Sequence, residues 1–438
     1  MRRSGPVRVA IAAAMIALTA TTVQAGAPTG DWTVFRNGPT NNVTIARNLS
    51  ATWKVVTGAG ISSSPSLSGT TLYVGNNRGD LNAIDVATGT VLWTVHLHNA
   101  LMSAPLLYRG LVIVGEGDEQ SSGSAPGSLQ YVGMGPSALI ALDARTGAFR
   151  WRSPVAGSAM PTGAIVDGVL LHHNGAGWLA AIDARTGKTL YTRNLHSIAS
   201  MTAALPIGND RIVTIGVLDN AAMQIMIRDG SIVWRTRFAS NGSGHGDCPP
   251  VTDGTRIICN YVAPADGSSY TAVGNVAIQH AYALDVKTGA IDWDVPLQSG
   301  VLPPRNEAAI PLLEGGVAFF GSAVSPYVHA LDAATGHVVW QTKVYGPVKG
   351  GMVLANGTVY FGDGKGYLWA LNAKTGAVVG NRKMPSGFNV GSPILVGETL
   401  VIGSRTGSVY ALPVESIRSG HDAVGLLSSS RSALRDSP

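Results

Sequence analysis

The chain has 438 residues with a formal net charge of +5, and only 13% of its residues are charged. Three arginines near the N-terminus account for much of that excess, which leaves about +2 on the rest, too little to indicate a nucleic acid or an anionic membrane surface as partner. No apolar run beyond the N-terminal segment is long enough to span a membrane.

The N-terminus has the pattern of an export signal. Arg2, Arg3 and Arg8 precede an apolar run over residues 9–20, and Val23-Gln24-Ala25 offers small residues for cleavage. We therefore predict a signal peptide over residues 1–25 and a periplasmic or secreted protein. No cysteine lies near the cleavage site, so we expect no lipid anchor.

One phrase, Ala-x-Asp/Asn-x-x-Thr-Gly, recurs along the chain, usually with an aromatic residue four positions after the glycine. Its copies begin at Ala83, Ala141, Ala181, Ala283, Ala330 and Ala370, and only the last has a glycine, Gly380, in place of the aromatic residue. The Asp side chain can accept turn amide protons and the Gly can adopt positive φ, so the phrase predicts a β-hairpin. The aromatic residue is expected to staple one unit to the next.

Two further strand-like runs precede each phrase, such as those over residues 64–68 and 71–74. Four short strands per unit are typical of a propeller blade, so the sequence predicts an all-β fold. The last unit stops at Leu412 without its phrase, and the run Ala51 to Val56 is expected to complete that blade and close the ring. Inner strands open near Ser62, Ser103, Pro161, Thr202, Cys248, Ala308, Gly350 and Ser392.

We therefore predict a single eight-bladed β-propeller of four-stranded antiparallel blades over residues 26–413. Residues 414–438 show little periodicity and are expected to form a flexible C-terminal tail.

The repeats, together with the opening Asp31-Trp32-Thr33-Val34-Phe35-Arg36-Asn37, resemble the pyrroloquinoline-quinone (PQQ) type propeller family. The resemblance extends from about Trp32 to Leu412. That family includes quinoprotein dehydrogenases, the BamB lipoprotein of outer-membrane protein assembly and tetrathionate hydrolases of acidophiles. Because one fold serves such different functions, the function has to be argued from the site.

Cys248 and Cys259 are the only cysteines. In an exported protein an even number favours a disulfide. If Asp253-Gly254 forms a two-residue turn, the two cysteines lie directly opposite each other on the arms of a hairpin. We therefore predict a structural disulfide. The adjacent cysteine pair of many quinoprotein dehydrogenases and a Cys-x-x-Cys-His haem motif are both absent from the sequence.

His172 and His173 are adjacent on an expected strand. Successive side chains of a strand point to opposite faces, so these two imidazoles cannot chelate one metal ion together. We expect no metal site.

The residues just before each inner strand should surround one mouth of the central channel. In blades one to four they are uncharged and partly thioether, with Ser62, Met102, Met160 and Met201. In blades five to eight they are mostly polar or charged, namely His245, Asp247, Arg305, Asn306, Glu307, Lys349 and Asn389.

This half of the mouth combines groups that suit an anionic substrate. Arg305 can clamp an oxyanion through two hydrogen bonds and Lys349 can act as a point charge, with Asn306 and Asn389 as further binding groups. Asp247 is the expected general base, and Glu307 and His245 are alternative proton carriers. The alternative is that these charges only pair with one another on a solvated rim, with Asp247 capping a turn.

Three functional classes remain open. The first is an enzyme or binder for a small anionic molecule, possibly a hydrolase that resembles tetrathionate hydrolase and needs no cofactor. The second is a non-catalytic scaffold resembling BamB, with protein partners at the blade loops. The third is a quinoprotein dehydrogenase, in which PQQ and calcium would be held near Asp247, Asn306 and Glu307.

Overall fold

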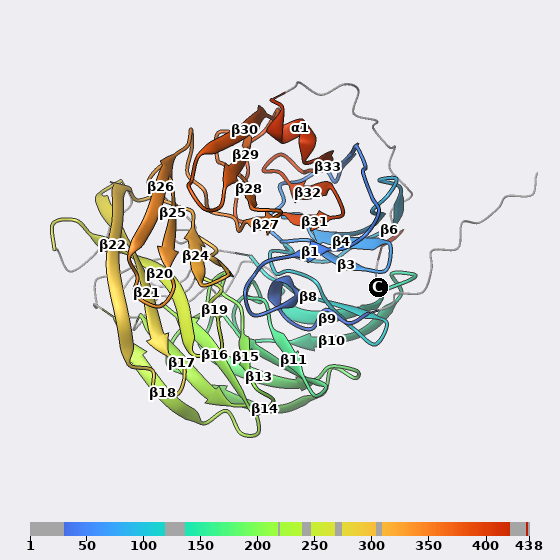
Figure 1. Cartoon of the computed structure of the whole chain (residues 1–438). Coiled ribbons are helices and arrows are strands. Elements are labelled where there is room, and N and C mark those ends of the chain that lie inside the picture. Colours follow the sequence, from blue (N-terminus) through green and yellow to red (C-terminus); the bar gives the residue numbers. More distant parts are fainter. Residues whose placement is uncertain are drawn as a thin grey trace, which may run out of the picture.

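The computed structural model describes residues 30–118, 136–217, 220–238, 247–267, 274–303, 309–420 and 435–436. Eight sheets, each built on four antiparallel strands, are arranged around a central axis (Figure 1). The colours pass around the ring from blue to red, so the last blade lies beside the first. The predicted eight-bladed propeller is confirmed.

The first four blades follow the chain from their inner to their outer strands. Blade 1 contains β3 (Ser66–Ser68), β4 (Thr71–Gly75), β5 (Asp80–Asp85) and β6 (Val91–His96). Blade 2 contains β7 (Leu106–Tyr108), β8 (Leu111–Glu116), β9 (Ala138–Asp143) and β10 (Phe149–Pro154). Blade 3 contains β11 (Ala164–Val166), β12 (Val169–His173), β13 (Trp178–Asp183) and β14 (Thr189–Asn194). Blade 4 contains β15 (Leu205–Ile207), β16 (Arg211–Gly216), β17 (Ala221–Met226) and β18 (Ile232–Arg237).

The remaining blades repeat this order, except that the last takes its outer strand from the N-terminal part of the chain. Blade 5 contains β19 (Val251–Thr252), β20 (Arg256–Pro264), β21 (Val276–Asp285) and β22 (Ile291–Val301). Blade 6 contains β23 (Leu312–Glu314), β24 (Val317–Phe320), β25 (Tyr327–Asp332) and β26 (Val338–Lys343). Blade 7 contains β27 (Val353–Ala355), β28 (Thr358–Gly362), β29 (Tyr367–Asn372) and β30 (Val378–Lys383). Blade 8 contains β31 (Ile394–Val396), β32 (Thr399–Gly403), β33 (Ser408–Pro413) and β2 (Trp53–Val56).

Closure of the ring follows the prediction. Strand β2 pairs antiparallel with β33, with Trp53 opposite Ala411 and Val55 opposite Val409. Two short strands pair in parallel at sheet edges, β1 (Thr44–Ile45) with β31 and β34 (Arg435–Asp436) with β6. Because blade 8 combines strands from both ends of the propeller, the ring has no seam where one blade lacks a strand.

The repeated phrase forms the predicted turn in each blade that carries it. In blade 1, Asp85 Oδ1 accepts hydrogen bonds from the amides of Ala87 and Thr88, at 3.0 and 2.9 Å, and from Thr88 Oγ1 at 2.9 Å. Gly89 has a φ of 73°. A Cβ there would also lie only 2.7 Å from Trp53, so only glycine fits.

The aromatic residue of each phrase fastens its blade to the next one. Its ring packs on the turn glycine of the following blade, in the pairs Trp53 with Gly89, Trp93 with Gly147, Trp151 with Gly187, Tyr191 with Gly230, Trp234 with Gly289, Trp293 with Gly336 and Trp340 with Gly376. Most of these indoles also donate a hydrogen bond to a carbonyl of that turn, as from Trp93 Nε1 to Ala144 O at 3.2 Å. The predicted staple is therefore present, and Trp53 of β2 supplies it for blade 8.

Gly380, which replaces the aromatic residue in blade 7, has a structural explanation. Helix α1 (Glu415–Arg418) packs against blade 7, and a Cβ on Gly380 would lie 2.5 Å from Ile417 O and 2.3 Å from Arg418 O. Ile417 is fully buried, and Arg382 Nη1 donates to Ser416 Oγ at 2.6 Å. The helix occupies the space of the missing ring, so the chain directly after β33 is ordered helix rather than the start of the predicted tail.

Residues 30–49, here called the N-terminal strap, bond to the inner strands of most blades. Trp32 exchanges hydrogen bonds with Leu107, at 2.8 and 2.9 Å. Strap carbonyls accept from inner-strand amides of blades 3, 5, 6 and 8 in the pairs Thr33 with Ile165, Pro39 with Thr252, Thr40 with Leu313 and Val43 with Leu395. The strap therefore ties distant blades together.

The short helix η1 (Phe35–Asn37) of the strap closes the channel. Phe35 packs with Ala104, Ala203 and Ile310, which come from blades 2, 4 and 6, so its ring lies at the axis. Arg36 is buried and donates from Nε, Nη1 and Nη2 to the carbonyls of Asn41, Pro393 and Met352, each at 2.7 Å. Burial lowers the pKa of Arg36 to about 9.

The adjacent histidines of β12 lie on opposite sides of the strand, as predicted. His173 bonds to Thr214 Oγ1 at 3.0 Å and to Ser197 O at 2.6 Å, whereas neither ring nitrogen of His172 has a hydrogen-bond partner among the residues that the structure describes. Burial lowers the pKa of His172 from its usual 6.5 to about 3. The folded protein therefore holds His172 in its neutral form.

This burial predicts a loss of stability in acid. Between pH 6.5 and pH 3 the unfolded chain takes up a proton at His172 that the folded chain does not, so the free energy of unfolding falls as the pH falls. At pH 4 the expected contribution is about 3 kcal/mol. We expect His172→Leu to reduce the loss between pH 7 and pH 4, measured by urea unfolding, by up to that amount. An unchanged pH dependence would contradict the assignment.

Candidate functional site

A cavity of about 730 Å³ opens at the channel mouth on the side away from Phe35. It is bounded by loops of blades 1, 2, 5, 6, 7 and 8, and the C-terminal end of β22 in blade 5 contributes Val301 to its lining. The lining residues are Gly60, Ile61, Ser62, Asn77, Met102, Val301, Pro303, Ala323, Val324, Pro347, Lys349, Gly364, Lys365, Phe388, Asn389 and Arg405. Since Phe35 closes the channel below, this mouth is the entrance to a funnel with one open end.

The described lining of this mouth cavity is positively charged. Lys349, Lys365 and Arg405 line it, and none of the described lining residues is an Asp or Glu. Within the described chain, neither the ammonium group of Lys365 nor the guanidinium group of Arg405 makes a hydrogen bond or ion pair, and both residues are exposed. Asn77 and Asn389 add neutral amide groups. The site therefore presents donors and positive charge suited to an anion.

A buried carboxylate holds the loop that carries Lys365. Asp363 Oδ1 accepts from the amides of Lys365 and Tyr367, each at 2.9 Å. Its Oδ2 accepts from Trp369 Nε1 at 2.9 Å and from the amide of Gly346 at 3.2 Å. All of these partners are donors, so the position requires a group with acceptors only.

The loops of blades 7 and 8 also interlock. Gly364 N donates to Pro347 O at 2.8 Å, and Arg405 N donates to Gly387 O at 3.0 Å. A Cβ on Gly387 would lie 2.4 Å from Gly364 O, so the two loops approach more closely than any side chain would allow. Lys365 and Arg405 are therefore carried by loops that fix each other.

Below the mouth the channel narrows to a second cavity of about 10 Å³, with room for about one water molecule. Ser62 and Met102 line both cavities, so the second cavity, here called the throat, continues the first. Phe35 forms part of its lining, and Asp247, only 9% exposed, lies beside it. Asp247 Oδ1 accepts from the amide of Met201 at 3.4 Å.

Seven of the blades contribute a described residue at this level, four positions before the inner strand begins. Around the axis these residues, here called the throat ring, are Ser62, Met102, Met160, Met201, Asp247, Lys349 and Val390, and the corresponding position of blade 6 lies outside the described residues. The eight blades share a backbone geometry but differ in this ring, so the chemistry of the site depends on the ring and on the loops above it.

The structure brings some of the predicted site residues together. Lys349 and Asn389 line the mouth cavity, and Asp247 lies beneath it in the throat. His245, Arg305, Asn306 and Glu307 lie outside the described residues, so their roles stay predictions. The cations Lys365 and Arg405 were not predicted because they lie in turns between the second and third strands of their blades, not before the inner strands. Asn77, which also lines the cavity, lies in the equivalent turn of blade 1, so an alignment of these turns would have pointed to Lys365 and Arg405.

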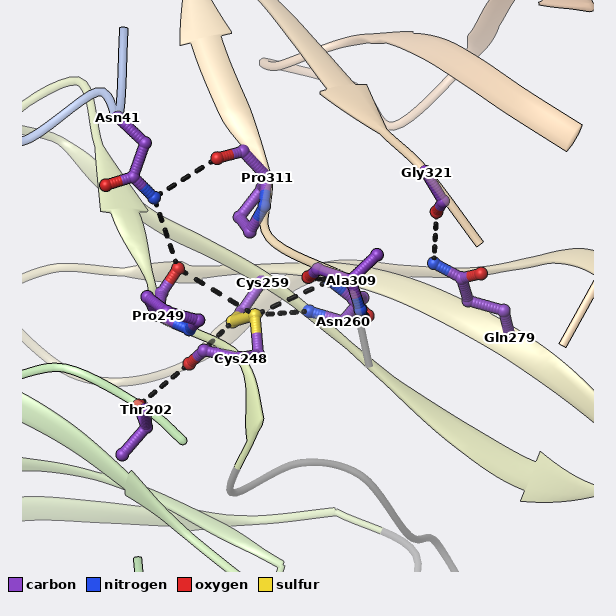
Figure 2. Close-up of a disulfide and its surroundings, with 10 residues drawn as sticks. All are labelled: Asn41, Thr202, Cys248, Pro249, Cys259, Asn260, Gln279, Ala309, Pro311 and Gly321. Carbon is purple, nitrogen blue, oxygen red and sulfur yellow. Dashed lines mark hydrogen bonds between the residues drawn. A yellow bond between two sulfur atoms is a disulfide. The ribbon is translucent and has the colours of Figure 1, made fainter. Parts of the chain in front are cut away.

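The predicted disulfide is present, but the predicted hairpin register is wrong. Cys248 and Cys259 are bonded, with their Cα atoms 6.2 Å apart (Figure 2). Val251 pairs with Ile258, which puts position 250 rather than Cys248 opposite Cys259. The turn is longer than two residues because Asp253 Oδ1 accepts from the amides of both Thr255 and Arg256.

The disulfide stabilises the backbone just below Asp247. Thr202 Oγ1 donates to Cys248 O at 2.8 Å, and Asn260 Nδ2 donates to Ala309 O at 2.7 Å (Figure 2). The disulfide of blade 5 therefore lies among hydrogen bonds to blade 4 on one side and blade 6 on the other. It fixes Cys248, the residue that follows Asp247.

These features define a class of protein, an eight-bladed propeller whose funnel opens at one end onto a cation-lined cavity. A family model described as "Outer membrane protein assembly factor BamB" matches residues 42–126, 120–205, 175–323 and 277–416. The chain belongs to that family of PQQ-like propellers.

Relatives named for two different functions are similar to the chain over most of its length. Outer membrane protein assembly factor BamB of Yersinia pestis is 24% identical over 82% of this chain and 87% of its own. Tetrathionate hydrolase of Acidithiobacillus ferrooxidans is 22% identical over 77% of this chain and 70% of its own.

Solved structures share the fold. BamB from Moraxella catarrhalis superposes with a TM-score of 0.59 at 16% identity, over 83% of this chain and 99% of its own. Quinohemoprotein alcohol dehydrogenase from Comamonas testosteroni superposes with a TM-score of 0.62 at 14% identity, over 92% of this chain and 82% of its own. At these identities the superpositions establish the fold and leave the function to the site.

Two structural features are absent from the described residues. No helix there is long and apolar enough to cross a membrane. No group of three or more His, Cys, Asp or Glu side chains in the same residues is placed to hold a metal ion.

The donors around Asp363 make a specific prediction. In Asp363→Asn the amide group would replace one acceptor oxygen and face N–H donors, so we expect a loss of about 2 kcal/mol in the free energy of unfolding. The Lys365 turn should also loosen, which would be seen as faster amide hydrogen exchange there. Asp332→Asn is the matched control, because Asn372 already fills the equivalent turn position in blade 7. Equal losses in both variants would contradict the argument.

Proposed function

We propose that this chain works in the cell envelope as a propeller that binds a small, multiply charged anion at its funnel mouth, and that it hydrolyses that anion without a cofactor. The observation that carries the proposal is the mouth cavity, which is lined by Lys349, Lys365 and Arg405 and by no described residue with a carboxylate. The names of the relatives support the location in the envelope and, in part, the hydrolysis.

The cations suit a ligand with more than one negative charge. Lys365 and Arg405 come from neighbouring blades and have no anionic partner within the described chain, so a ligand does not have to displace one. A concave site with walls of low dielectric constant concentrates their field. Arg405 can bind an oxyanion through two parallel hydrogen bonds, whereas lysine acts as a point charge.

Hydrolysis requires a base close to the bound anion. Asp247 lies in the throat directly below the mouth cavity, where its carboxylate can accept a proton from a water molecule. The water oxygen then bonds to the electrophilic atom of the substrate, and the leaving group departs as an anion that the cations of the mouth stabilise. Only the chain's own residues and water take part in this step.

A second candidate function is a non-catalytic scaffold resembling BamB. The relatives of that name match the chain over most of their own length. Neighbouring outer strands of blades 6 and 7 also expose the apolar pairs Val338-Val339 and Val378-Val379, as expected of a surface that contacts proteins. Partners at such surfaces would not need the mouth cations.

The quinoprotein alternative has less support from the described residues. Calcium binds through carboxylate, carbonyl and amide oxygens. The described lining of the mouth provides lysine and arginine instead, with the amides of Asn77 and Asn389. The two residues suggested as calcium ligands, Asn306 and Glu307, lie outside the described chain, so PQQ and calcium stay an untested alternative.

Anion binding is tested by titrating sulfate, thiosulfate and tetrathionate into the protein in a calorimeter, with thermal unfolding in parallel. We expect Arg405→Ala and Lys365→Ala each to weaken binding about tenfold or more, since a charge-assisted hydrogen bond contributes about 1.4 kcal/mol or more. Lys374→Ala, an exposed cation in a turn of the same blade as Lys365, is the control. Equal affinity in all variants, or no binding, would refute the anion site and favour the scaffold.

Catalysis is tested separately with Asp247→Asn. We expect this variant to bind the anion at least as well as the wild type and to lose hydrolysis by a factor of about 100 or more, as is usual for a general base. Product release is followed by ion chromatography, with and without added PQQ and calcium. Activity that appears only with PQQ and calcium would support the quinoprotein alternative. Anion binding without any turnover would show that the protein binds the anion but does not hydrolyse it.

A further inference from the structure

Three methionines occupy consecutive positions of the throat ring. Met102, Met160 and Met201 come from blades 2, 3 and 4, each four residues before its inner strand, and all three line the throat cavity. They pack together in one cluster with Ala100. Met102 and Met160 are 5% and 1% exposed, and Met201 is partly buried. The blade order therefore brings three thioethers from separate segments to the axis of the molecule.

Methionine often fills irregular gaps in an apolar core, and that explanation has to be weighed first. These side chains line a cavity of about one water molecule instead of filling it. The cavity is also not wholly apolar, because Asp247, Thr162 and Ser62 share its lining. A cavity with hydroxyl and carboxylate groups in its lining is not the apolar gap that a packing methionine usually fills.

We propose that the three thioethers hold one soft monovalent metal ion, Cu(I) or its analogue Ag(I), at the throat. Thioether sulfur is a neutral, polarisable donor that favours Cu(I) over hard ions such as magnesium or calcium. The carboxylate of Asp247 lines the same cavity, so a single positive charge would lie close to a negative one. The cavity has room for a single ion.

The surrounding groups fit a soft ion better than a harder one. Both cysteines are bonded to each other, and no cluster of His, Cys, Asp or Glu able to hold a metal occurs in the described chain. The nearest ring cation, Lys349, lines the mouth cavity above the throat. Met102 lines both cavities, so an ion can reach the throat from solvent through the mouth.

This site does not depend on the proposed anion binding, because it uses the thioethers and not the cations of the mouth. It does share the throat and Asp247 with the proposed hydrolysis, so a bound ion would exclude the attacking water and the metal-loaded chain is expected not to hydrolyse the anion. The two proposals therefore fail separately. Arg405→Ala is expected to leave metal binding in place, and substitution of the methionines by leucine is expected to leave the mouth cations in place.

The test is an anaerobic titration of the full chain with Cu(I) against a chromogenic Cu(I) chelator, repeated with Ag(I) by calorimetry in nitrate buffer. We expect one ion per chain. Met160→Leu keeps nearly the same volume and should weaken binding about tenfold or more, and the triple variant M102L/M160L/M201L should abolish it. Met384→Leu, a buried methionine of the core between blades 7 and 8, is the matched control and should bind as the wild type does.

Two readouts keep the result clear. X-ray absorption at the copper edge should show sulfur ligands in the wild type and lose them in the triple variant. Thermal unfolding of each variant without metal shows that the fold is intact, and if the triple variant does not fold, Met160→Leu alone decides. No stoichiometric binding by the wild type, or unchanged binding in Met160→Leu, would overturn the proposal.

Discussion

The contact between each aromatic ring and the turn glycine of the next blade is the interaction on which the rest of the structure depends. A ring such as Trp93 can lie flat on the following turn only because Gly147 has no side chain, and its indole then bonds to Ala144 O. The same contact repeats around most of the circle, and Trp53 of the N-terminal strand supplies it between the last blade and the first. Between blades 7 and 8, where Gly380 replaces the ring, helix α1 packs against blade 7 instead. Each blade is thus held at a fixed angle to its neighbour, and the ring closes with eight.

Closure has a direct consequence for the site. It brings described residues of seven blades to the throat ring and gathers the loops of distant blades around one cavity. The N-terminal strap seals the other end, where Phe35 contacts blades 2, 4 and 6 and Arg36 bonds to blades 7 and 8. The proposed ligand would therefore enter and leave by the mouth, past Lys365 and Arg405.

The repeat explains the fold, and the departures from the repeat explain the site. In the throat ring, three methionines are followed by Asp247, and Lys349 occupies a later position. Such differences cost little in stability because the stapling contacts lie at the opposite end of each blade, in the hairpin turns. This separation lets one architecture carry different sites, so the function has to be argued from the side chains at the site.

Much of this architecture is determined by the sequence alone, because its causes are local. The Asp, Thr and Gly of each phrase form their turn with residues that adjoin them, so the blades, their number and the closing strand were predictable, as was the disulfide between the only two cysteines. Other features were decided only by the tertiary structure. The register of the Cys248 hairpin depends on how Asp253 caps its turn. After the last strand of blade 8, the chain passes back to blade 7, where helix α1 fills the space that Gly380 leaves open. The mouth cavity joins Lys349, Lys365 and Arg405 from different loops, and those loops meet only because eight blades close into a ring, which no local pattern encodes.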